Sequence, residues 1–79
     1  MGYARPRPKL LASKLLTIRQ DLGLSQSQIG KRLGIQEYTN VSKYERDVNE
    51  PTLMIVLAYA RLAEIPVEYL IDDALDLPL

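Results

Sequence analysis

Residues 36–43 carry amide, hydroxyl and ammonium groups within one short stretch. Glutamine and asparagine amides can form paired hydrogen bonds with adenine, lysine can donate to the acceptors of guanine, and threonine or tyrosine can contact the thymine methyl group. These groups read a base sequence when a helix carries them into the major groove. The side chains expected to contact bases are Gln36, Tyr38, Thr39, Asn40 and Lys43.

Two residues of this stretch have competing interpretations. Glu37 could accept a hydrogen bond from cytosine, but next to phosphates it is expected to be repelled or held in a salt bridge. Asn40 is also a suitable N-cap for a helix that starts one turn late. The sequence leaves both alternatives open.

A second set of side chains is suited to the phosphate backbone. The start of a helix presents free N–H groups and a partial positive charge to a phosphate oxygen. Phosphate contacts are expected from Gln26, Ser27, Ser42 and Arg46. Lys31, near the end of the same helix, is interpreted as solvated surface charge that the helix dipole favours.

These groups lie on two helices joined by a tight turn. Ser25 can cap a helix over residues 26–33, and Gln28 three positions later completes a capping box. Gly34 follows Leu33, where the chain needs a left-handed residue to end that helix. A second helix is predicted over residues 37–46, with Val41 on its buried face. This is the layout of a helix-turn-helix.

Three further helices are predicted around this pair. Apolar residues recur at helical spacing over 8–22, residues 53–63 are apolar nearly all round, and residues 67–71 follow Pro66. No segment has the pattern of a strand, so the fold class is all-α, a compact five-helix bundle. The expected organisation is a flexible basic arm over 1–8, a helix-turn-helix domain over 9–71 and an acidic tail over 72–79 that frays.

The composition argues against several functions. The chain of 79 residues has neither cysteine nor histidine, so no catalytic residues, metal ligands or cofactor site are predicted. Asp72, Asp73 and Asp76 are interpreted as solvated acids rather than an active site. No apolar run could span a membrane and no signal-peptide core is present, so a cytoplasmic location is expected. A separate small-molecule domain is not expected in a chain of this length.

The zero net charge conceals a strong asymmetry. Residues 1–46 hold nine Lys/Arg and three acidic residues, or +6, whereas residues 47–79 hold one Arg and seven acidic residues, or −6. A basic half that also carries the helix-turn-helix pattern favours double-stranded DNA as a partner. The arm could add contacts to the backbone or the minor groove through Arg5, Arg7 and Lys9, and a plain disordered tail is the alternative.

Four blocks of sequence resemble the phage-repressor/Cro-like (XRE-type) helix-turn-helix family of bacterial transcription regulators. They are LSQxxIxxxLGI, VSxYER, EPTL and AxxxxIPVEYLI, in order and near the family spacing. The resemblance implies a five-helix DNA-binding domain in which Gln26 braces a phosphate and the recognition helix. It also implies that Val41 points inward and that Leu53, Ala60, Ile65 and Leu70 belong to the core.

The chain departs from the family pattern at three places. One extra residue separates Ile35 from Val41, which either lengthens the turn or shifts the register of the recognition helix. Asp47 and Glu64 stand where the family often has glycine. Aspartate tolerates the left-handed conformation better than most residues, so the turn at Asp47 is expected to survive with some strain.

The apolar character of residues 53–63 suggests an interface. If one face of this helix is in the core, a second apolar face remains, and such patches usually mark a contact with another chain. The expected homodimer interface comprises Met54, Ile55, Ala58 and Leu62. The first hypothesis is a sequence-specific DNA-binding transcriptional regulator, a repressor, that reads the major groove with the helix over residues 37–46. The alternative is an antitoxin-like adaptor that keeps the fold and binds a partner protein through this helix and the acidic half.

Overall fold

The computed structural model describes residues 7–79 of the chain. These residues contain five α-helices and no strand. The helices are α1 (Leu11–Asp21), α2 (Gln26–Leu33), α3 (Thr39–Glu45), α4 (Leu53–Ala63) and α5 (Glu68–Ile71). The predicted all-α bundle is therefore confirmed. No helix in residues 7–79 has both the length and the apolar character that a membrane span needs.

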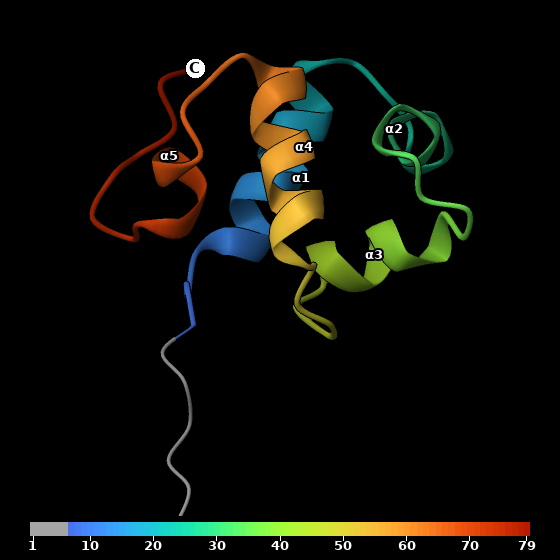
Figure 1. The fold of residues 1–79 in the computed structure, drawn as a ribbon, viewed down its shortest axis with the longest axis horizontal. Helices are drawn as coiled ribbons and strands as arrows, with labels where there is room; N and C mark the ends of the chain where they lie inside the picture. The colour runs from blue at the N-terminus through green and yellow to red at the C-terminus, as the bar shows by residue number, and fades with distance from the viewer. Residues whose placement is uncertain (1–6) are drawn as a thin grey trace, which may run out of the picture.

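The α1 helix lies at the centre and contacts α3, α4 and α5, while α2 packs against α3 and α4. Figure 1 shows α4 crossing in front of α1, with α2 and α3 on one side and α5 with the C-terminal segment on the other. The two helices that carry the predicted DNA-reading residues thus form one side of the bundle. The central pair packs against their inner side, with α1 in contact with α3 and α4 in contact with α2.

The core gathers apolar side chains from every helix. Six of its largest members are fully buried, namely Leu15, Ile18, Ile29, Val41, Tyr59 and Leu70. The hydroxyl of Tyr59 has no hydrogen-bond partner among the described residues, and burial raises the pKa of this phenol above its ordinary range. The assignment of Leu53 to the core is wrong, since this side chain is 81% exposed at the first position of α4. Ala60 and Leu70 are buried as expected, and Ile65 is half-buried.

The α1 helix starts three residues later than its pattern predicted, at Leu11 rather than Pro8. Its start is capped by a residue distant in sequence, because the Asp73 carboxylate accepts from the backbone N–H groups of Lys9 (2.8 Å) and Leu10 (3.0 Å). These hydrogen bonds hold the pKa of Asp73 below its ordinary value. A cap from across the molecule leaves no local sequence signal, which explains the error in the boundary.

The acidic segment after α5 is tied to α1, so the expected fraying is wrong. Lys14 is only 6% exposed, and its Nζ donates to the backbone carbonyls of Asp72 (2.9 Å) and Leu75 (2.7 Å). Leu77 packs against the core cluster. A lysine is seldom buried unless its ammonium group is paired. Its burial is possible because the ammonium group meets carbonyl oxygens instead of apolar atoms.

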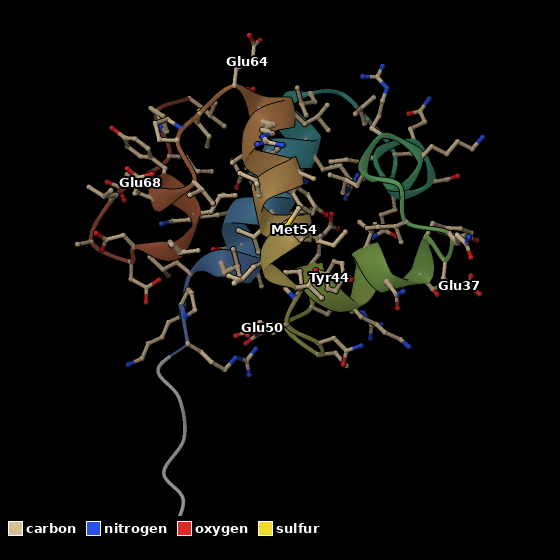
Figure 2. All side chains as sticks on the ribbon, viewed as in Figure 1. Glu37, Tyr44, Glu50, Met54, Glu64 and Glu68 are labelled. Atoms are coloured by element: carbon tan, nitrogen blue, oxygen red, sulfur yellow. The ribbon has the colours of Figure 1, made fainter. Side chains whose placement is uncertain are left out.

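The two non-glycine residues at turn positions take up left-handed backbone conformations. Asp47 has φ 58° and Glu64 has φ 59°. Glu64 is the C-cap of α4, and its N–H donates to the carbonyl of Arg61 (3.1 Å). Figure 2 shows the Glu64 side chain pointing away from the bundle at the end of α4. Both positions therefore keep the turn that glycine would make, at the steric cost of a Cβ atom.

Candidate nucleic-acid interface

The start of α2 is fixed by the predicted capping box. The Ser25 hydroxyl accepts from the backbone N–H of Gln28 (3.0 Å), and the Gln28 side chain accepts from the backbone N–H of Ser25 (2.8 Å). The N–H groups of Gln26 and Ser27 have no acceptor among the described residues. The helix therefore presents two free N–H groups where a phosphate oxygen could bind.

The turn between α2 and α3 absorbs the extra residue of this chain. Gly34 ends α2 in the left-handed region at φ 74°, and the N–H of Ile35 donates to the carbonyl of Gly30 (2.8 Å). The chain then continues through Tyr38 before α3 begins, yet Val41 remains fully buried. The turn is thus longer while the inward-facing position is kept.

The α3 helix runs from Thr39 to Glu45, shorter than the predicted span of residues 37–46. Gln36 and Tyr38 consequently lie in the turn, whereas Thr39, Asn40 and Lys43 lie on the helix. Gln36, Tyr38 and Thr39 are exposed, and Asn40 and Lys43 are half-buried. The alternative role of Asn40 as N-cap does not hold, because the N-cap residue is Tyr38 and no side chain caps this helix.

Glu37 is exposed in the turn, at the outer end of α3 (Figure 2). Neither a salt bridge nor a side-chain hydrogen bond involves it within residues 7–79. A free carboxylate on this edge would repel phosphates, so it disfavours close approach of a backbone strand at that point. The predicted salt-bridged state of Glu37 is not found.

A partly buried network of hydrogen bonds holds α3 against α1 and α2. Arg19 donates through Nε and Nη2 to the two carboxylate oxygens of Glu45, at 2.6 and 3.1 Å. Gln26 Nε2 donates to the same carboxylate (3.0 Å), and Arg19 Nη1 donates to the carbonyl of Leu24 (3.0 Å). The carboxylate is 5% exposed, and its hydrogen bond raises the pKa of Arg19. One carboxylate on α3 therefore links this helix to both α1 and α2.

The predicted phosphate-binding side chains surround this network. An amide nitrogen carries two N–H groups, so Gln26 keeps one donor after its bond to Glu45. Arg46 Nε donates to the Ser42 hydroxyl (3.1 Å), which leaves the terminal guanidinium nitrogens of Arg46 available. Ser27 is exposed beside the start of α2. Gln26 and Ser27 thus lie at the start of α2, Ser42 in the middle of α3 and Arg46 at the C-cap of α3, and each carries a donor group.

Of the predicted arm residues, Arg7 is paired with acidic side chains. Arg7 donates to Asp47 (3.1 Å) and to Glu50 (3.0 Å), so the first described residue is held to the segment that joins α3 and α4. Lys9 is exposed, and only its backbone takes part in the cap by Asp73. Arg5 lies outside the described residues.

Sequence reasoning missed the role of Arg19 and gave Glu45 only a position in a motif. The two residues lie 26 positions apart, and no local pattern connects them. The available signal was Arg19 on the polar face of α1 together with Glu45 at the C-terminal end of α3, since the C-terminal end of a helix favours cations over acids. Within the described residues, no group of acidic side chains could hold a metal ion.

The arrangement defines a small helix-turn-helix domain with a polar, donor-rich edge formed by α2 and α3. The model of the protein family described as helix-turn-helix matches residues 15–70 of the chain. The chain belongs to this family, of the XRE type, as the resemblance of the four sequence blocks implied. Among the curated proteins, none matches the chain in sequence.

Solved structures share the fold. The P22 c2 repressor protein, solved in complex with a synthetic operator, is 25% identical, with a TM-score of 0.73 over 82% of this chain and 97% of the repressor chain. The N-terminal DNA-binding domain of SinR from Bacillus subtilis is 18% identical, with a TM-score of 0.69 over 77% of this chain and 88% of that domain. SinR in complex with DNA gives 18% identity and a TM-score of 0.68, over 76% and 95% of the two chains.

Proposed function

We propose that this DNA-binding regulator of the helix-turn-helix family is a sequence-specific transcriptional repressor that acts in the cytoplasm, without a catalytic role. One observation carries the proposal, namely the brace of Arg19, Glu45 and Gln26. It holds α3, which presents the exposed Thr39 and the half-buried Asn40 and Lys43. A reading helix must be fixed in orientation while its side chains stay free, and this chain meets both conditions. The complex of the P22 c2 repressor with an operator supports the same assignment.

In this proposal Thr39, Asn40 and Lys43 read base edges in the major groove, because they lie on the first two turns of α3. Gln36 and Tyr38 would contact bases or phosphates from the longer turn. The N–H groups at the start of α2, with Gln26, Ser27, Ser42 and Arg46, would hold the backbone. Arg7 could contribute only after it leaves its acidic partners, whereas the side chain of Lys9 is already exposed.

Two substitutions separate reading from backbone binding. We expect Asn40→Ala to weaken binding by about 1–3 kcal/mol and to relax the preference at one base position. Arg46→Gln should weaken binding to all sequences alike and reduce the salt slope by about 1. Lys31→Gln removes an exposed charge of the same helix-turn-helix and should change base preference at no position. If Asn40→Ala leaves the selected sequence unchanged, α3 does not read bases there.

We further propose that the chain acts as a homodimer. A single domain of this kind buries only about 600–1,000 Å² on DNA, so useful specificity needs two half-sites. Of the four expected interface residues, Met54 is 69% exposed, whereas Ile55, Ala58 and Leu62 are half-buried and pack against the core. The exposed Leu53 beside Met54 extends the apolar patch at the start of α4.

Sedimentation equilibrium tests the dimer. Met54→Glu removes the apolar side chain that the core does not use, so it should halve the mass of a dimer without unfolding the domain. Thr52, the N-cap of α4, is exposed, so Thr52→Ser, which keeps the capping hydroxyl, is the control and should leave the mass unchanged. An equal mass for the wild type and Met54→Glu would contradict self-association through this patch.

A further inference from the structure

A hollow of about 400 Å³ lies between the end of α2 and the outer side of α4. Its lining combines four apolar side chains with two guanidinium groups and comprises Arg32, Met54, Leu57, Ala58, Arg61 and Leu62. None of the six is fully buried. Figure 2 shows Met54 on the side of α4 that faces the viewer, away from α1. The hollow is therefore an open groove along a helix and not an enclosed cavity.

The apolar floor of this groove has the spacing of a helix stripe. Met54, Ala58 and Leu62 follow one another at intervals of four residues on α4, and Leu57 precedes Arg61 by four. Side chains at this spacing form one continuous face. Exposed apolar faces of this kind on small domains usually receive another protein segment.

The two arginines define the chemistry of the segment that fits. Arg32 and Arg61 are exposed, and neither has an ion-pair partner within residues 7–79. No acidic side chain lines the groove. We propose that it binds an amphipathic helix from a partner protein, with leucine-like side chains on the apolar floor and carboxylates against Arg32 and Arg61. This inference goes beyond DNA binding and does not rest on it.

Other occupants fit the groove less well. A second copy centred here would bring the Arg32 and Arg61 side chains of two chains together without acids to neutralise them, and like charges at an interface are unfavourable. The homodimer proposed above uses the patch of Leu53 and Met54 at the start of α4, which shares only Met54 with the groove. A small ligand needs enclosure over most of its surface, and the open lining does not supply it. Duplex DNA would meet the arginines but would leave the apolar floor unused.

A designed peptide tests the proposal on the full chain. The probe, called the acidic peptide, is a fluorescein-labelled helical peptide of about 14 residues with leucines at i, i+4 and i+7 flanked by glutamates. A control peptide, called the lysine peptide, has the same sequence with lysines in place of the glutamates. Fluorescence anisotropy should show that the acidic peptide binds the wild type and that Arg61→Glu weakens it at least about tenfold. The lysine peptide should instead prefer Arg61→Glu to the wild type.

Lys31→Glu is the matched control, because it makes the same charge change on α2 outside the groove, and it should weaken the acidic peptide by no more than about twofold. Circular dichroism verifies that all variants fold. Equal binding of the two peptides, absence of binding at about 1 mM, or equal loss in Lys31→Glu and Arg61→Glu would overturn the proposal.

Two further results would reassign the groove and overturn the proposal. If the peptide fails to bind and Ala58→Glu abolishes self-association, the groove is an interface between copies of this chain. If Arg61→Glu lowers affinity for duplex DNA as much as Arg46→Gln does, the two arginines belong to the DNA-binding surface.

Discussion

Replacing Glu45 with alanine should remove a large part of the stability of this domain. The carboxylate is 5% exposed and accepts hydrogen bonds from Arg19 and Gln26. Its loss leaves the Arg19 guanidinium, whose side chain is 18% exposed, without its counter-charge. Breaking one partner of a buried ion pair costs about 3–5 kcal/mol. A domain of this size has a total stability of roughly 4–12 kcal/mol, so the loss should be at least about a quarter of the total.

Urea unfolding monitored by circular dichroism measures this cost, and thermal unfolding should show the melting temperature lowered by at least about 12 °C. The double variant Arg19→Met/Glu45→Leu should recover at least half of the loss, because apolar side chains of similar size need no charge compensation. Arg7→Gln is the control, since it breaks an exposed ion pair and should cost less than about 1 kcal/mol. A cost below about 1 kcal/mol for Glu45→Ala would refute the view that this carboxylate braces the three helices.

Three further predictions concern single positions. Gly30→Ala should raise the free energy of unfolding by about 0.5–1 kcal/mol in urea titrations, because alanine favours the helix and its Cβ would meet Tyr38 at an ordinary contact distance of 3.4 Å; a loss of stability would show that α3 cannot yield there. Tyr59→Phe should leave calorimetric stability unchanged or raise it by up to about 1 kcal/mol, since it removes a buried hydroxyl without a partner, and a clear loss would reveal a hydrogen bond to it. Because the pKa of Asp73 is lowered in the fold, its contribution to the stability of the folded state is present above the ordinary carboxyl pKa and is lost as the pH falls through the lower folded value. The melting temperature of Asp73→Asn should therefore fall less than that of the wild type between about pH 5 and pH 2, and parallel curves would contradict the cap on α1.

The local signals in the sequence predicted the helix-turn-helix well. The capping box at Ser25 and the left-handed Gly34 set the ends of α2 in the structure as they did in the sequence. Both signals act within a few residues, so they survive without knowledge of the tertiary fold. The α4 helix has the bounds that the apolar run over residues 53–63 predicted, and in the structure Thr52 caps it.

The errors arise where distant residues decide. Asp73 caps α1 from more than 60 positions away, and Lys14 becomes buried because the C-terminal segment supplies carbonyl oxygens. Neither contact leaves a periodic trace in the sequence. The resemblance to the family placed Leu53 in the core, where the structure leaves it exposed. In a helix that is apolar nearly all round, periodicity could not correct this, because it does not say which face the bundle covers.

The candidate site was predictable as a region but not as a geometry. Residue types placed polar contacts on residues 36–43, whereas the start of α3 at Thr39 depends on how the longer turn packs over Gly30. The groove with Arg32 and Arg61 is lined by residues of both α2 and α4, which are brought together only by the tertiary fold. Its chemistry followed from the structure alone.

The most direct test of the proposed function is a fluorescence-anisotropy titration of the chain into pooled random duplex DNA at two salt concentrations, followed by sequencing of the retained fraction. We predict binding that weakens with salt by a slope of about −0.9 for each phosphate contact, and enrichment of one palindromic motif. Asn40→Ala should alter that motif. The absence of binding at low salt, or binding that enriches no sequence, would contradict the assignment of α3 as a DNA-reading helix.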